Sequence, residues 1–131
     1  MNTLQAVVLL ACFFAAAEAG MNCNITVKFQ SDTHDKVRVD LLVPSLKTMS
    51  EPVVLSEWKE EKHVKITGKD CEKKHWIFMT YGWEKGNWVF KKKSQSKFAG
   101  NGWFLAKVSD TYDVVILDRY GIMCAEGNCG K

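Results

Sequence analysis

Apolar and polar residues alternate with a period of two in the first half of the chain, from residue 23 onward. Residues 23–29 (CNITVKF) and 37–43 (VRVDLLV) place apolar side chains at every second position, and Pro44 ends the second run. This period predicts strands with one buried and one solvated face, since proline cannot donate to a strand ladder. Short runs at 53–55 and 64–66 predict two further strands, with residues 56–62 (SEWKEEK) as the loop between them.

The second half of the chain is apolar on both faces of its predicted strands. Residues 75–81 (HWIFMTY) and 87–91 (NWVFK) flank a turn bracketed by Gly82 and Gly86, which predicts a hairpin. Residues 103–108 and 112–117 predict a second pair around a turn at 109–111, with both faces of 112–117 buried. Seven to eight short strands without a long amphipathic helix predict an all-β fold, an antiparallel β-sandwich or small barrel.

The N-terminal segment has the pattern of a secretory signal peptide. Residues 4–17 (LQAVVLLACFFAAA) form an apolar run too short to cross a bilayer core of about 30 Å, which needs roughly 20 residues. Ala17 and Ala19 supply the small side chains that signal peptidase requires, although residues 1–3 carry no Lys or Arg. The alternative is a buried N-terminal helix, but no polar face interrupts the run. We predict a signal peptide at 1–19 and one secreted β-domain at 20–131, without a membrane anchor.

Loss of this segment would turn an odd number of cysteines into an even one. Cys12 leaves with the signal peptide, and the four that remain are Cys23, Cys71, Cys124 and Cys129. Four cysteines in an oxidising compartment predict two disulfides, for which three pairings exist. We favour Cys23 with Cys71 and Cys124 with Cys129, because the Ala-Glu-Gly-Asn spacer contains the glycine that a tight loop needs. A zinc site using Cys71 and His75 is the alternative, but the close Cys-x-x-Cys pairs typical of zinc are absent.

The chain is mildly basic and has no recognisable catalytic or metal site. Its formal net charge is +3, and loss of Glu18 would make the remainder more positive. This charge favours an acidic glycan or an anionic extracellular protein as partner, but it falls short of the dense basic footprint of a nucleic-acid-binding protein. No serine lies in a Gly-x-Ser-x-Gly turn, and the three histidines are scattered along the chain. We therefore predict a non-enzymatic protein without metal or cofactor.

Two tryptophans and a lysine run are the predicted binding residues. Trp83 lies in the predicted hairpin turn and Trp58 in the predicted loop. A large ring at such a place either forms a hot spot for a partner or folds back onto the sheet. The densest positive run consists of Lys91, Lys92, Lys93 and Lys97. These lysines either attract an acidic partner or keep a sheet edge solvated.

One sequence motif predicts a covalent modification. Asn24-Ile25-Thr26 is an N-glycosylation sequon, and the strand pattern places Asn24 and Thr26 on the same polar face. Cys23 beside it could hinder access of the transferase. We predict glycosylation at Asn24 in the secreted protein.

The general layout resembles the small secreted, or excretory and secretory, disulfide-bonded proteins of nematodes. The shared features are a short signal peptide, a β-rich body, Cys23 near the mature start and the terminal Cys124 and Cys129 pair. This resemblance implies a binding or immunomodulatory role towards an extracellular or host partner. The layout is also similar to the netrin-like barrel of metalloproteinase inhibitors, in which a cysteine at the mature N-terminus binds the metal of the target. Here residues 20–22 precede Cys23, and the Cys-x-Cys start of that family is replaced by Cys23-Asn24-Ile25.

The sequence thus predicts a secreted, non-enzymatic binding protein that uses an exposed aromatic and lysine-rich surface. A protease inhibitor of the netrin-like barrel type is the alternative. A carrier of lipid or another small ligand is a third possibility, since small barrels can enclose a cavity.

Overall fold

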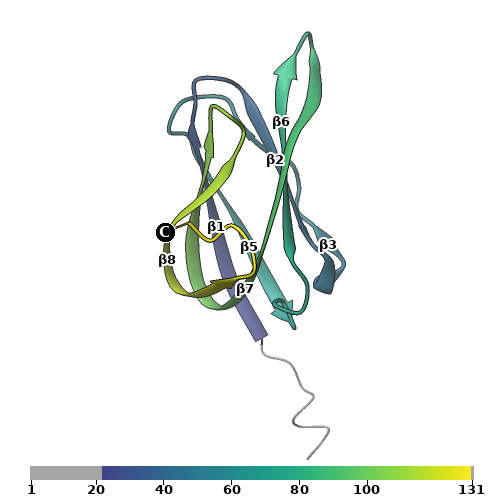
Figure 1. Ribbon diagram of the computed structural model, residues 1–131, viewed down its shortest axis with the longest axis vertical. Helices are drawn as coiled ribbons and strands as arrows, with labels where there is room; N and C mark the ends of the chain where they lie inside the picture. Colours follow the sequence, from purple (N-terminus) through teal and green to yellow (C-terminus); the bar gives the residue numbers. More distant parts are fainter. Residues whose placement is uncertain (1–21, 131) are drawn as a thin grey trace, which may run out of the picture.

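The computed structural model describes residues 22–130, and these residues form an all-β domain (Figure 1). The predicted signal peptide and its cleavage site lie outside the described residues. One short 3-10 helix, η1 (Pro44–Leu46), interrupts the strands. The strands are β1 (Asn22–Asp32), β2 (Val37–Val43), β3 (Thr48–Met49), β4 (Val53–Leu55), β5 (Glu61–Lys69), β6 (Trp76–Glu84), β7 (Asn87–Ser109) and β8 (Val114–Ala125).

The eight strands form one curled sheet, a half-barrel with two facing halves. The strand order is β3-β2-β6-β7-β1-β5, with β4 also paired to β2 and β8 also paired to β7. The first part of β7 pairs with β6, and its second part pairs with both β1 and β8. All pairs are antiparallel except β1 with β7, because β7 crosses from one half to the other and then runs in the direction of β1. The predicted fold class is confirmed, with this one parallel pair as an addition.

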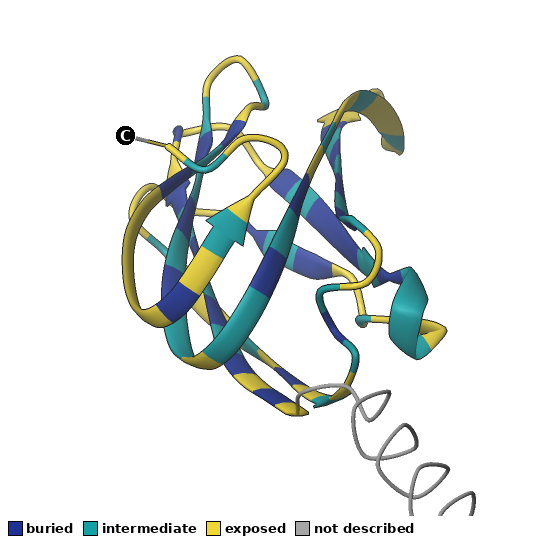
Figure 2. Cartoon of the chain, turned by 60° about the horizontal axis from the view of Figure 1, so that its bottom comes forward, coloured by how far each residue is buried: buried dark blue, intermediate teal, exposed yellow. Residues whose placement is uncertain are grey.

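The core lies on the concave side of the curled sheet. Buried residues alternate with exposed or half-buried ones along β1 and, apart from the buried Asp40, along β2, as the period of two predicts (Figure 2). The largest fully buried side chains are aromatic, and each contributes roughly 1.5–3 kcal/mol by its removal from water. The Phe98 and Phe104 rings stack with centroids 4.2 Å apart, and Phe78 meets both rings edge-on. The Trp76 indole donates a 2.8 Å hydrogen bond to the Cys71 carbonyl, which satisfies its buried N–H.

Two disulfides fix the chain in the pairing favoured by the sequence. Cys23 is bonded to Cys71, with Cα atoms 6.1 Å apart, and Cys124 to Cys129, with Cα atoms 5.7 Å apart. The first joins β1 to the turn before β6 and is buried, whereas the second closes a short loop near the C-terminus. Such bonds persist in an oxidising, non-cytosolic environment. Within residues 22–130, no helix has the length and apolar character needed to cross a membrane.

β7 and β8 differ from the pattern predicted for their part of the sequence. The sequence predicts separate strands at 87–91 and 103–108, whereas β7 runs without interruption through the lysine run and the glycines between them. Both faces of residues 112–117 are predicted to be buried, but the side chain of Leu117 is 45% exposed. Val114 and Ile116 do face the core. The outer face of β8 is open to solvent, and a local apolar run does not reveal this.

Candidate functional site

The β6–β7 hairpin projects beyond the rest of the sheet (Figure 1). Its strands are joined by Lys85 and Gly86, whose φ angles are 50° and 81°. Positive φ at both positions is typical of the two-residue type I′ turn, which matches the right-handed twist of hairpin strands. The turn is thus shorter than the sequence predicts, and Trp83 lies in β6 rather than in the turn itself.

Four aromatic rings form two cross-strand pairs on the outer face of this hairpin. Trp83 is opposite Trp88 and Tyr81 is opposite Phe90 in the β6–β7 register. The ring centroids are 5.0 Å and 5.7 Å apart, and both pairs are edge-to-face. The Trp83 side chain is 44% exposed and the Phe90 side chain 52% exposed. Cross-strand aromatic pairs stabilise a hairpin, and these also leave an apolar surface in contact with water.

Two cations from β2 and the turn before it lie over these rings. Arg38 pairs with Tyr81 in the β2–β6 register, and its guanidinium carbon is 4.8 Å from the Tyr81 ring centroid. The Lys36 ammonium is 4.4 Å from the Trp83 centroid. Both distances are within the range of cation–π attraction. We call this surface the aromatic face, and its residues are Lys36, Arg38, Tyr81, Trp83, Trp88 and Phe90.

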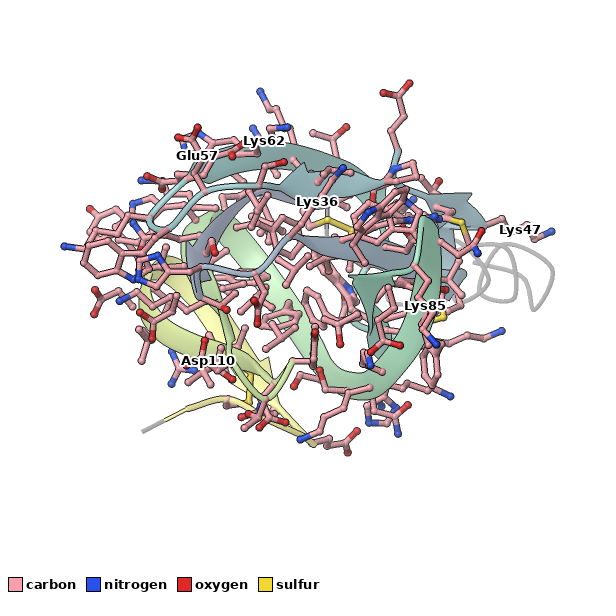
Figure 3. All side chains as sticks on the ribbon, turned by 90° about the horizontal axis from the view of Figure 1, so that it is seen from above. Lys36, Lys47, Glu57, Lys62, Lys85 and Asp110 are labelled. Atoms are coloured by element: carbon pink, nitrogen blue, oxygen red, sulfur yellow. A yellow bond between two sulfur atoms is a disulfide. The ribbon has the colours of Figure 1, made fainter. Side chains whose placement is uncertain are left out.

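The second predicted tryptophan, Trp58, lies at the same end of the molecule. It belongs to the β4–β5 loop, is 48% exposed and stacks on His34 with ring centroids 5.5 Å apart. His34 and Lys36 belong to the same β1–β2 turn, so one short segment contacts Trp58 at one end and Trp83 at the other. Seen from above, Lys36 lies between Glu57 and Lys85, which mark the two neighbouring segments (Figure 3).

The predicted lysine run does not form one free positive surface. Lys91 makes an ion pair with Glu84, Lys92 lies 3.0 Å from Asp113, and Lys97 lies 2.7 Å from Glu126. Lys93 has no ion pair within residues 22–130. These pairings arise because strand alternation and a bulge between Thr80 and Tyr81 direct neighbouring lysines to different surroundings.

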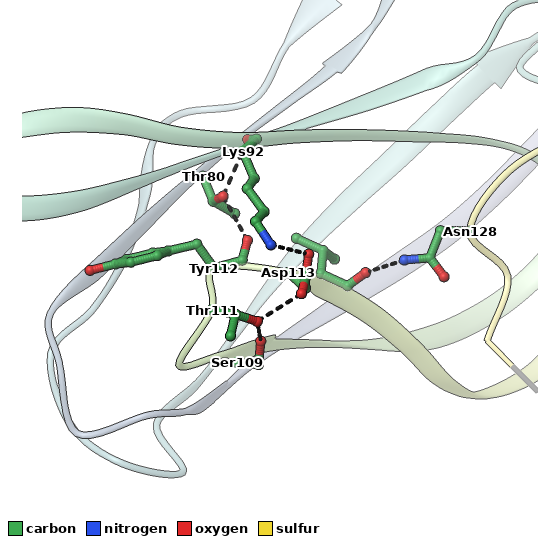
Figure 4. Close-up of polar contacts among 8 residues, drawn as sticks. Thr80, Lys92, Ser109, Thr111, Tyr112, Asp113 and Asn128 are labelled. Carbon is green, nitrogen blue, oxygen red and sulfur yellow. Dashed lines mark hydrogen bonds and ion pairs between the residues drawn. The ribbon is translucent and has the colours of Figure 1, made fainter.

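A polar cluster holds Lys92 against the β7–β8 loop (Figure 4). The buried Thr80 hydroxyl donates to the Tyr112 carbonyl at 2.8 Å and lies 3.2 Å from the Lys92 carbonyl. A hydrogen bond from the Thr111 hydroxyl and the positive charge of Lys92 hold the pKa of Asp113 below its ordinary value. Asp113 therefore stays ionised and fixes Lys92 in a structural role beside the hairpin.

Cys71 and His75, which the alternative zinc site would use, both make other contacts. Among the described residues, no three His, Cys, Asp or Glu side chains come close enough together to hold a metal ion. Cys71, which a zinc site would need as a thiolate, is bonded to Cys23. His63 contacts Glu61 and His75 contacts the Glu126 carbonyl, both at exposed positions.

Comparison with known proteins adds no identification. No protein-family model matches the sequence, and neither curated proteins nor solved structures give a significant match. The resemblance to small secreted nematode proteins therefore stays a prediction.

Sequence reasoning identified Trp83 and Trp58 but missed most of the aromatic face. Trp88, Tyr81 and Phe90 could have been found, because residues at equal distances from a two-residue turn share one face of a hairpin. Lys36 and Arg38 carried no such signal. Their position over the rings depends on the pairing of β2 with β6, which are far apart in the sequence.

Proposed function

We propose that this chain is a secreted, non-enzymatic binding protein whose aromatic face contacts an acidic surface on an extracellular protein. The observation that carries the proposal is the gathering of four rings and two cations on the outer face of a projecting hairpin. Trp, Tyr and Arg are the residue types most enriched in protein–protein hot spots. Lys36, which has no ion pair within residues 22–130, supplies the positive charge that favours an acidic partner, whereas the guanidinium of Arg38 is already paired with Asp40 at 2.8 Å.

Secretion rests on two independent supports. The sequence of residues 1–19 has the features of a cleaved signal peptide. The two disulfides belong to an oxidising compartment, and they join the four cysteines that would remain after cleavage of the predicted signal peptide.

The function can be tested by comparing what the native protein and a hairpin variant capture from extracellular extracts. Replacing Trp83 and Trp88 together by alanine should reduce capture of a specific partner at least about tenfold, because hot-spot truncations typically cost 2 kcal/mol or more. Bound proteins would be quantified by mass spectrometry. Tyr120→Ala is the matched control, since Tyr120 is 72% exposed on the other half of the sheet.

Equal capture by the native protein and the double variant would remove the aromatic face as the binding site. Loss of the captured partner after digestion of acidic glycans would instead assign the face to a glycan. The alternative, an inhibitor of netrin-like type, needs a cysteine at an exposed chain end. Cys23 lies within β1 and is 4% exposed, so no observation favours that alternative.

The secreted protein is expected to carry an N-linked glycan at Asn24. Asn24 is exposed on the outer face of β1, where Thr67 and Asn101 are its neighbours on the adjacent strands. Expression through a eukaryotic secretory pathway should give a product whose mass falls on treatment with an N-glycosidase. Thr26→Ala removes the sequon while keeping Asn24, and this variant should show no mass change. An unmodified native product would contradict the prediction.

A further inference from the structure

The two halves of the curled sheet leave an opening on each side, and one opening is filled by the chain itself. Asn128 donates its backbone N–H to the Gln95 carbonyl of β7 at 3.3 Å and its side-chain amide to the Val114 carbonyl of β8 at 2.7 Å. The Ser96 hydroxyl donates to the Asn128 carbonyl at 2.7 Å. A short C-terminal segment, closed by the Cys124–Cys129 disulfide, therefore bridges β7 and β8.

The opening on the other side, between β4 and β5, is a groove of about 400 Å³. Val53, Val64 and Ile66 give it an apolar lining. Beyond these lining residues, near the C-terminal end of β5, Leu46 of η1 packs against Gly68. Within the described part of the chain, β1 is the only strand that pairs with β5. The other edge of β5, which is nine residues long, therefore has no strand partner. Such an edge presents alternate N–H and C=O groups that can pair with a further strand.

The free edge of β5 is positively charged. Lys62 and Lys65 line the groove together with one acidic residue, Glu51, and Lys69 lies further along β5. The three lysines outnumber Glu51 and Glu61, the first residue of β5, so positive charge predominates at this edge. Lys62 lies 3.5 Å from Glu60, whereas neither Lys65 nor Lys69 forms an ion pair within residues 22–130. A second copy of this chain, pairing through the same edge, would place two lysine-rich strands side by side. Like charges opposite each other destabilise a strand pair, whereas an acidic strand would be attracted.

We propose that the groove between β4 and β5 binds an extended acidic peptide segment of a partner protein, which adds a strand to the free edge of β5. Main-chain hydrogen bonds to β5 supply affinity, and alternate side chains supply specificity. Apolar side chains on one face of the peptide cover Val53, Val64 and Ile66. Acidic side chains between them meet Lys65 and Lys69. This site is separate from the aromatic face and does not depend on the function proposed for it.

The test uses three fluorescein-labelled synthetic heptapeptides and fluorescence anisotropy with the intact disulfide-bonded domain. The peptide Asp-Val-Glu-Val-Glu-Val-Asp should bind with a Kd at or below about 100 μM. The charge-reversed peptide Lys-Val-Lys-Val-Lys-Val-Lys should bind at least about tenfold more weakly, because it repels the lysines. The acidic peptide with proline at its centre should also lose at least about tenfold, because proline lacks the N–H that a ladder needs.

Variants of the domain locate the site. Lys65→Glu should weaken binding of the acidic peptide at least about tenfold, and the matched control Lys74→Glu, in the turn before β6, should change it less than about twofold. Trp83→Ala should leave peptide binding unchanged, which separates this result from the test of the aromatic face. Equal binding of the acidic and proline peptides, or no effect of Lys65→Glu, would overturn the proposal. Light scattering that shows dimers formed through β5 would overturn it as well and assign the edge to a second copy.

Discussion

Replacing Cys23 and Cys71 together by alanine should lower the free energy of unfolding by about 4 kcal/mol. The two cysteines are separated by 48 residues, so the bond removes many conformations from the unfolded chain. Both are also buried in the core. Urea denaturation followed by tryptophan fluorescence measures the change, and Trp76, which contacts the Cys71 carbonyl, is a buried reporter.

The second disulfide supplies the matched control. Cys124 and Cys129 are only 5 residues apart, so replacing both by alanine should cost about 2 kcal/mol on the same argument. The loss should come mainly from loosening of the C-terminal segment that bridges β7 and β8. Equal costs for the two double variants would contradict the assignment of the Cys23–Cys71 bond as the main covalent stabiliser.

Replacing Gly102 by alanine should destabilise the domain by more than about 3 kcal/mol or prevent folding. A Cβ atom at Gly102 would lie 1.8 Å from the Tyr120 carbonyl oxygen and 2.8 Å from its carbon. These are backbone atoms of β8, so the clash cannot be relieved by a side-chain rotation. The β7–β8 pairing would have to open at its register shift between Gly100 and Trp103. Circular dichroism and thermal unfolding would measure the loss.

Gly68→Ala is the control for this glycine. A Cβ at Gly68 would meet only the Leu46 side chain, at 2.6 Å from its nearest methyl carbon. That side chain lies at the edge of the sheet and can change rotamer, so the cost should stay below about 1.5 kcal/mol. If Gly102→Ala were no more destabilising than Gly68→Ala, the close approach of β7 and β8 would not be a requirement of the fold.

The sequence predicted the strands well where the local alternation of apolar and polar residues matches the buried and solvent-facing sides of the strand. In β1 and β2 every second residue is apolar, and these residues do face the core. The prediction failed in β7, where Lys91 to Asn101 contain few apolar residues. That segment is held as a strand by its partners β6 and β8, which supply hydrogen bonds that no local pattern reveals.

The candidate site was only partly predictable for the same reason. Trp83 and Trp58 stood out because large rings in turns and loops are unusual. The lysine run stood out by its density, yet three of its four members pair with Glu84, Asp113 and Glu126, none of which adjoins its lysine in sequence. The sequence of a lysine run does not reveal which of its lysines form ion pairs with acidic residues in the folded protein.

The sequence by itself determined the β class and the inward-facing residues of β1 and β2, because these follow from the residue period. It left three disulfide pairings open and favoured the one that the structure contains. It also predicts an export signal at residues 1–19, whose cleavage would remove Cys12 and leave the four cysteines that form both disulfides. Only the tertiary structure decided that Lys36 and Arg38 lie over the hairpin rings and that the edge of β5 is free. Both depend on which distant strands pair, and this is set by the cooperative packing of the core.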